Sequence, residues 1–229
     1  MNNLSEQAKE SRDKILKSAE ELFSTKGFDG TSVREVAEKA GVNKALIFYY
    51  FKNKEEILQC LFDTLIQDMK QEAMKGLTEE KVKQMEQGNL VPDHDKLKFS
   101  NLSDDAIELY MDAAINKSLD FYLERKSIIR ILIAESLKKG DHSSLIFRAT
   151  DLLTDKGADS ISDVIEQNGV KVQIDNQALV DRFFAGLMPV LSFAIYFDEW
   201  KEHYHMSDEE FKDAFIKSYK TTYGNHYRV

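Results

Sequence analysis

The stretch TSVREVAEKAGVNKALIFYYFKNKEEIL, residues 31–58, decides the fold of the N-terminal part of the chain. Ser32 and Glu35 have the spacing of a capping box and open a short helix, which Gly41 ends. Asn43 then caps a second short helix. Two short helices joined by a tight turn have the spacing of a DNA-binding helix-turn-helix. The stretch therefore predicts a module whose second helix can enter the major groove of a duplex.

The second helix, over residues 44–50, needs one face for the protein core and another for DNA. Ile47, Tyr50 and Phe51 share an apolar face that can anchor the helix. The opposite face carries Lys44, Ala45, Phe48 and Tyr49. A lysine at the N-terminal end of this helix can reach a phosphate or the edge of a guanine. The helix is therefore expected to pack through its apolar face and to meet the duplex through the opposite face.

Neighbouring residues add further groups that could meet DNA. Thr31 and Ser32 put hydroxyls and free amide groups at a helix N-terminus, which is a phosphate-binding arrangement, and Lys54 does the same one helix later. Ala45 is small, so the backbone can come close to the duplex. Leu46 can touch a thymine methyl group but cannot hydrogen-bond a base.

The rest of the chain is predicted to be helical, because apolar residues recur at helical spacing and no sustained alternation with a period of two appears. Residues 88–103, which include Pro92, form the one long connection. The fold class is therefore all-α, with a helix-turn-helix DNA-binding domain over residues 1–54 and a larger helical ligand-binding and dimerisation domain over residues 55–229. The helices are expected at residues 15–26, 32–40, 44–50, 53–76, 103–122, 127–138, 144–166, 176–202 and 208–223.

Composition limits the class of protein. The 229 residues are 42% hydrophobic, a fraction that excludes a largely disordered chain. The chain has one cysteine, Cys60, which excludes an internal disulfide framework and a multi-cysteine metal site. The net charge is −9, but residues 1–54 carry +2 and the remainder carries −11, so the N-terminal part is the one expected to meet a polyanion. No secretory signal is visible, and the longest apolar stretch, residues 183–197, is too short and interrupted to span a membrane. The expected location is the cytoplasm.

The helix-turn-helix residues also carry a likeness to a known family. Phe23, Gly27 and Phe28 precede the rest of the pattern, which lies in residues 31–58. The whole pattern, over about residues 11–58, resembles the TetR family of bacterial transcriptional regulators. The resemblance implies an all-α homodimer, usually a repressor, that binds a palindromic DNA operator. It also implies that a small molecule bound in the C-terminal domain changes the spacing of two DNA-reading heads and releases the DNA.

The predicted DNA interface combines this resemblance with helix geometry. By the resemblance, six of its residues lie where family members touch DNA, mostly at phosphates: Thr31, Ser32, Arg34, Lys44, Tyr49 and Lys54. Two residues depart from the usual pattern, because Phe48 stands where a tyrosine is common and Leu46 where a threonine or small polar residue is frequent. These departures bear on base preference and affinity. The predicted DNA-binding residues are Thr31, Ser32, Arg34, Asn43, Lys44, Ala45, Leu46, Phe48, Tyr49 and Lys54.

The last two predicted helices, residues 176–202 and 208–223, are the next strongest signal. The first is apolar nearly all round, which indicates burial against its own chain and against a second copy. The resemblance implies that these helices form the four-helix bundle of a dimer, and the alternative is a monomeric core. Pro189 removes a backbone donor and should kink its helix.

A ligand pocket is less well marked. Glu135 shares a helical stripe with apolar residues, as does Arg182, so either could meet a charged ligand or pair with the other. The alternatives are a structural salt bridge and a location at the surface. Aromatic side chains at helical spacing could line a cavity or could simply be core. The candidate ligand-binding residues are Phe121, Tyr122, Glu135, Arg182, Phe184, Met188, Tyr196 and Trp200.

No motif for catalysis, cofactor binding or metal binding is found, so the chain is not expected to be an enzyme and no cofactor or metal is expected. His203 and His205 are two residues apart and do not share a helix face, which argues against a metal pair. Three alternatives stay open: a helical regulator that acts through protein partners without a small-molecule ligand, a helical enzyme with an incidental helix-turn-helix, and an activator. The sequence identifies neither the effector nor the operator.

Overall fold

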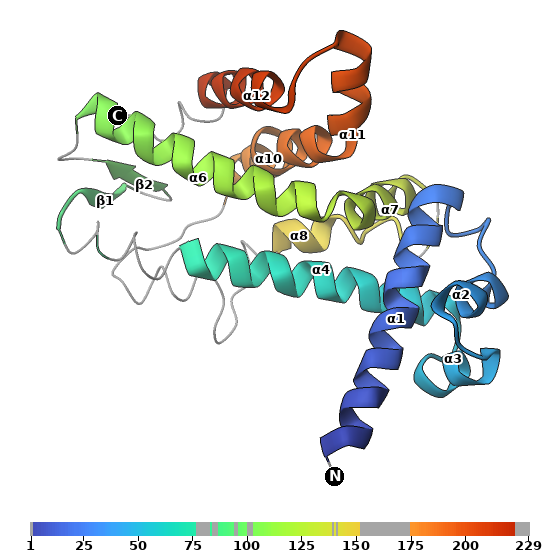
Figure 1. Cartoon of the computed structure of the whole chain (residues 1–229). Coiled ribbons are helices and arrows are strands. Elements are labelled where there is room, and N and C mark those ends of the chain that lie inside the picture. The colour runs from blue at the N-terminus through green and yellow to red at the C-terminus, as the bar shows by residue number, and fades with distance from the viewer. Residues whose placement is uncertain are drawn as a thin grey trace. The chain divides into compact units, whose positions relative to one another are not determined.

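The computed structural model describes residues 2–76, 83, 87–93, 96–99, 103–138, 140, 142–151 and 175–222, and it confirms a helical fold class (Figure 1). The N-terminal helices are α1 (Asn2–Lys26), α2 (Val33–Ala40), α3 (Lys44–Tyr50) and α4 (Lys54–Gly76). The later helices are α6 (Asp104–Glu124), α7 (Lys126–Ser136), α8 (Phe147–Asp151), α10 (Asn176–Val180), the π-helix η2 (Asp181–Leu187), α11 (Met188–Tyr204) and α12 (Asp208–Thr222). Most of the predicted helix at residues 144–166 lies outside the described residues.

The predicted long connection contains a short β-hairpin. Strand β1 (Leu90–Asp93) pairs antiparallel with β2 (Lys96–Phe99), so that Leu90 lies opposite Phe99. Each strand has four residues, the shortest run over which an alternating pattern can indicate a strand, and β1 contains Pro92. This hairpin lies within the predicted connection, where no strand was expected, and is an exception to the all-α class.

The described residues pack into two compact units. The N-terminal unit takes its residues from Met1–Gln67 and Ser127–Ile146, and the C-terminal unit takes them from Asp68–Lys126 and Phe147–Val229. Helix α4 contributes to both units, because its residues run through the boundary at Gln67. The functional division at residue 54 remains a prediction.

The core of the N-terminal unit joins α1, α2 and α3. Ile15 and Phe23 of α1, Val36 of α2 and Ile47 of α3 are all buried, as their helical spacing predicts. The ring of Phe23 lies 5.2 Å, between centroids, from that of Phe28 in an edge-to-face contact. These apolar contacts hold the two short helices, each too short to be stable alone, against α1.

The core of the C-terminal unit joins α6, α11 and α12. Leu119 of α6 is buried together with Phe193 and Phe197 of α11 and Phe211 and Ile216 of α12. The ring centroids of Phe193 and Phe211 are 4.7 Å apart. The predicted burial of residues 176–202 is therefore confirmed for α11, whose buried side chains pack against helices of the same chain.

The helix around Pro189 is not uniformly α-helical. The segment η2 ends directly before α11, and the N–H of Met188 donates to the carbonyl of Phe183, five residues back. Pro189, near the start of α11, has no N–H to donate. The structure therefore has a π-helical segment just before Pro189, and the kink expected at this residue stays a prediction.

Within the described ranges, none of the helices combines the length and the apolar character that crossing a bilayer requires. The same residues bring no three His, Cys, Asp or Glu side chains together in a group that could hold a metal ion.

Candidate nucleic-acid interface

The first helix of the helix-turn-helix begins at a complete capping box. The Ser32 hydroxyl accepts from the Glu35 N–H at 3.2 Å, and the Glu35 carboxylate accepts from the Ser32 N–H at 2.8 Å. The helix ends at Gly41, whose φ of 66° lies in the left-handed region that favours glycine. Both ends of α2 therefore lie where the sequence places them.

The second helix, α3, is capped and anchored as predicted. The Asn43 side-chain oxygen accepts from the Leu46 N–H at 2.7 Å, which satisfies one of the free amides of the first turn. Ile47 is 1% exposed and Phe51 is buried at the end of the helix. The expected core face of α3 is therefore confirmed for Ile47 and Phe51, whereas Tyr50 is only half-buried.

The opposite face of α3 is open to solvent. Lys44 and Ala45 are exposed, and so are Phe48 at 49% and Tyr49 at 77%. The Lys44 ammonium lies 5.6 Å from the centroid of the Phe48 ring. The Tyr49 ring packs edge-to-face on Tyr50, with centroids 5.0 Å apart. Large exposed aromatics beside a lysine form a surface fitted for a partner.

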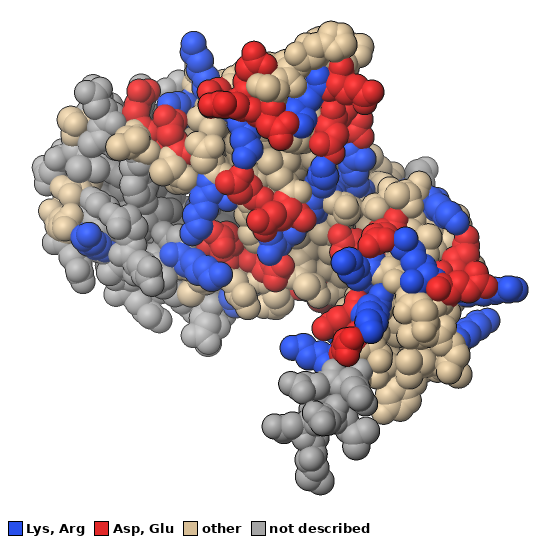
Figure 2. Space-filling model, viewed as in Figure 1, with Lys and Arg blue, Asp and Glu red and all other residues tan. Residues whose placement is uncertain are grey.

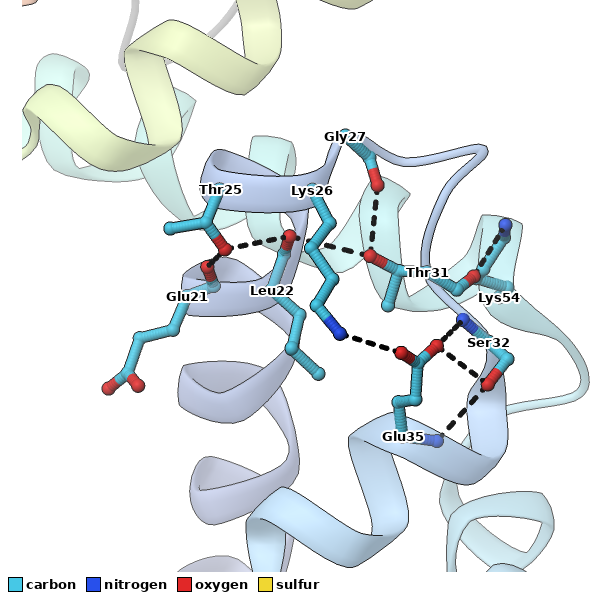
Figure 3. A network of polar contacts seen from close by, with 9 residues as sticks. All are labelled: Glu21, Leu22, Thr25, Lys26, Gly27, Thr31, Ser32, Glu35 and Lys54. Carbon is cyan, nitrogen blue, oxygen red and sulfur yellow. Dashed lines mark hydrogen bonds and ion pairs between the residues drawn. The ribbon is translucent and has the colours of Figure 1, made fainter.

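Thr31 differs from its expected role. Its side chain is 2% exposed, and its hydroxyl donates to the carbonyl of Gly27 at 2.9 Å, with the carbonyl of Leu22 at 3.4 Å (Figure 3). Its N–H donates to the carbonyl of Phe28. The structure gives this hydroxyl an internal role in the turn before α2, in place of the exposed phosphate contact expected from the sequence.

Lys54 is half-buried, and its ammonium bonds to groups of the protein itself. Its ammonium donates to the carbonyls of Phe28 at 2.7 Å and Thr31 at 2.9 Å, and it lies 4.2 Å from the centroid of the Phe28 ring. Sequence spacing could not show this, because the two carbonyls are 26 and 23 residues away. The observed role of Lys54 is to hold the α1–α2 turn against the start of α4.

The other predicted residues lie at or near the surface. Arg34 is paired with Glu38 at 2.7 Å, but both side chains are exposed, so the pair is weak and Arg34 can turn to another anion. Leu46 is half-buried. Ser32 and Asn43 are exposed, yet each already uses its side-chain oxygen as a helix cap.

An ion pair from Lys26 joins the capping box of Ser32 and Glu35 (Figure 3). The Lys26 ammonium, 2.7 Å from the Glu35 carboxylate, and the Ser32 N–H and hydroxyl lower the pKa of Glu35 from 4.5 to about 2. A pKa lowered in the folded state means that the stabilisation is fully present above pH 4.5 and is lost as the pH falls toward 2. Lys26 and this network were not singled out from the sequence.

We therefore expect Glu35→Gln to destabilise the protein near neutral pH, and we expect the effect to shrink as the pH falls from 4.5 toward 2, where the carboxyl of the folded, unaltered chain becomes protonated. Urea denaturation of both proteins across this pH range measures the difference in the free energy of unfolding. An NMR titration of the Glu35 carboxyl provides the direct check. A folded-state pKa near 4.5 would contradict the assignment.

Glu135 is a buried acid, as its helical stripe predicts, but its partners are residues of its own unit. It is 3% exposed, and one carboxylate oxygen lies 2.7 Å from the Lys138 ammonium. Lys138 also pairs with Asp29 at 2.7 Å. The structural salt bridge is therefore the alternative that the structure supports for Glu135, in place of a ligand contact.

The remaining ligand candidates belong to the C-terminal unit and do not share one environment. The rings of Phe121 and Tyr122 pack on each other, and burial raises the pKa of Tyr122 to about 12. The aromatic side chains of Phe184, Tyr196 and Trp200 are exposed. Arg182 and Met188 are half-buried.

A groove of about 720 Å³ lies between α6 and α12, and none of the predicted ligand residues lines it. Most of its lining residues are polar or charged, and Lys220 is paired with Asp112 at 2.6 Å inside it. The lining residues are Glu108, Asp112, Asn116, Asp213, Ile216, Lys217, Lys220 and Thr221. The acidic and basic residues that line this groove belong to α6 and α12, and they form no motif that could be recognised in the sequence.

Charge is mixed on the one face of the molecule that Figure 2 draws. On the face drawn in Figure 2, acidic and basic side chains are interspersed. The excess of two positive charges in residues 1–54 therefore forms no single basic patch on that face.

Known proteins resemble the chain most clearly over the helix-turn-helix. Residues 15–61 match the model of the bacterial regulatory proteins of the tetR family. The "probable HTH-type transcriptional regulator YttP" of Bacillus subtilis (strain 168) is 56% identical over 50 residues, which cover 22% of this chain and 24% of YttP. IcaR of Staphylococcus aureus (strain Newman), a negative transcriptional regulator of the biofilm operon icaADBC, is 40% identical over 58 residues, which cover 24% of this chain and 31% of IcaR.

The likeness in structure extends further along the chain than the likeness in sequence. The transcriptional regulator FadR from Bacillus subtilis, in complex with stearoyl-CoA, superposes with a TM-score of 0.54 over 90% of this chain and 96% of FadR, at 16% identity. At this identity the match shows a shared fold. The sequence matches to YttP and IcaR span only about a quarter to a third of those proteins. Residues 15–61 therefore resemble the DNA-binding part of the tetR family of bacterial regulatory proteins, and the fold that the chain shares with FadR extends over most of its length.

Proposed function

We propose that the chain is a transcriptional regulator that binds a palindromic DNA operator as a homodimer and represses transcription, and that a small molecule bound in the C-terminal domain releases it. The observation that carries the proposal is the exposed face of α3, where Lys44 and Tyr49 stand opposite the buried Ile47. A helix that is anchored on one face and open on the other can enter a major groove. The protein then acts in the cytoplasm, where bacterial DNA lies.

Two features support the homodimer. Tyr196 and Trp200 of α11 are large and exposed, one helical turn apart, and such a surface is typical of protein interfaces. A palindromic operator has two half-sites about 34–36 Å apart, so a two-fold dimer can place one α3 helix in each of two successive major grooves. The resemblance of residues 15–61 to the tetR family supports the same arrangement.

The proposed response to a small molecule has support from the shared fold. FadR carries stearoyl-CoA, so this fold can hold a ligand. A ligand that prefers one conformer of the dimer shifts the population toward that conformer and changes the affinity for DNA. The second candidate function, regulation through protein partners, is favoured by the groove between α6 and α12, because its paired charges resemble a polar surface more than an apolar ligand pocket.

We expect Lys44→Ala to weaken DNA binding and to reduce the dependence of affinity on salt. Each phosphate contact that is lost lowers the slope of log affinity against log salt by about 1, so a dimer should lose about 2. The measurement is a fluorescence anisotropy titration, at several salt concentrations, of a duplex that the protein selects from a random library. Saturation at two chains per duplex tests the dimer in the same experiment.

Lys117→Ala is the matched control, because Lys117 is also an exposed lysine and lies on α6 in the C-terminal unit. It should leave the slope unchanged. An unchanged slope for Lys44→Ala would remove Lys44 from the interface. Selection of no duplex by the unaltered protein would overturn the proposed function.

A further inference from the structure

The exposed face of α3 has an apolar centre. Ala45 and Phe48 are three residues apart, so they lie side by side on the helix surface, and neither side chain can donate or accept a hydrogen bond. Lys44 and Tyr49 supply the polar groups of this face. The centre of the surface therefore cannot recognise a base by hydrogen bonding.

The Phe48 side chain is accessible to a partner outside the protein. About half of its side chain is exposed, at 49%, although the preceding residue, Ile47, is buried. The Lys44 ammonium near the ring is a polar neighbour and does not shield it from water. Burying this ring against an apolar group of a ligand would be favourable in proportion to the area covered.

The floor of the major groove offers one apolar group, the C5-methyl of thymine. The other base edges present donors and acceptors, which an apolar side chain would cover without a hydrogen bond and at a cost in free energy. We infer that Phe48, with Ala45 beside it, reads thymine methyl groups, so that Phe48 is a specificity-determining residue and each operator half-site carries thymine at the contacted positions. The inference rests on the proposed function and names the bases that it recognises.

The test replaces single thymines by deoxyuridine in the duplex selected from a random library. Deoxyuridine pairs as thymine does and lacks only the C5-methyl group. Each methyl group that is buried against the protein should contribute about fourfold in affinity, so substitution in both half-sites should weaken binding about 15-fold. Uracil outside the half-sites should change nothing.

Two variants assign the effect to the ring. Phe48→Ala should bind the thymine and deoxyuridine duplexes with a ratio close to 1, because no ring remains to contact the methyl group. Phe48→Tyr keeps the ring and should keep the fourfold ratio. Since Phe48 is half exposed, both variants should fold, and circular dichroism checks this.

The outcomes separate the two proposals. If a specific duplex is bound but deoxyuridine has no effect at any position, the reading of thymine is overturned and the regulator remains. If the methyl effect persists in Phe48→Ala, another group reads the methyl and the assignment to Phe48 is wrong. If no duplex is selected, the proposed function fails, and this inference fails with it.

Discussion

Replacing Ile47 by alanine is expected to lower the free energy of unfolding by about 3 kcal/mol and to remove specific DNA binding. Ile47 is 1% exposed and is the residue of α3 that fixes this seven-residue helix to the core. A helix of two turns is unstable alone, so losing its anchor should release it from the correct orientation. Urea denaturation followed by circular dichroism measures the loss of stability, and amide hydrogen exchange across residues 33–50 locates it.

Leu46→Ala is the matched control on the same helix. Leu46 is the preceding residue and is half-buried, so its truncation should cost less than about 1 kcal/mol. Equal losses for the two variants would show that α3 is not anchored through Ile47. If the Ile47→Ala protein is destabilised but still binds DNA specifically, then the anchoring of α3 through Ile47 is not required for recognition.

Replacing Lys54 by methionine is expected to lower the free energy of unfolding by about 2 kcal/mol. Methionine keeps a long apolar side chain but removes the ammonium that donates to the carbonyls of Phe28 and Thr31. Hydrogen bonds from a charged donor are stronger than neutral ones, and the partial exposure of Lys54 limits the loss. The midpoint of urea denaturation provides the measurement.

The comparison with Lys52→Met tests whether the effect belongs to the turn. Lys52 is an exposed lysine two residues earlier, and its replacement should change stability by less than about 0.5 kcal/mol. If Lys54→Met leaves stability unchanged and lowers only the salt dependence of DNA binding, then the role expected from the sequence, a phosphate contact, is the correct one. A loss of stability, with a change in the salt slope smaller than that expected for Lys44→Ala, supports the role seen in the structure.

Local chemistry made the helix-turn-helix predictable. The N-terminal caps of α2 and α3 depend on side chains within three residues of the amides they satisfy, so Ser32 and Asn43 could be placed from spacing alone. The end of α2 could be placed at Gly41 because glycine favours the left-handed conformation found there. The buried side of α3 followed from helical periodicity in the same way, with Ile47 inside.

Contacts between distant segments were not predictable from spacing. The Lys54 ammonium belongs to the start of α4 and the two carbonyls that it bonds belong to the turn after α1, so only the folded chain brings them together. Glu135 was correctly read as facing an apolar interior, but one member of its ion-pair network, Asp29, is more than a hundred residues away in sequence. The hairpin of β1 and β2 was missed because its strands are too short to show a pattern.

The π-helical segment η2 has a consequence for how this region can evolve. A π turn accommodates one more residue than the α-helical turn it replaces, so a deletion of one residue within Asp181–Leu187 could restore an ordinary helix without opening a gap in the chain. Elsewhere in a helix, the same deletion would rotate every later side chain by about 100° relative to its neighbours. Among related chains, length differences of a single residue should therefore be tolerated just before Pro189, while the aromatic core that follows keeps its alignment.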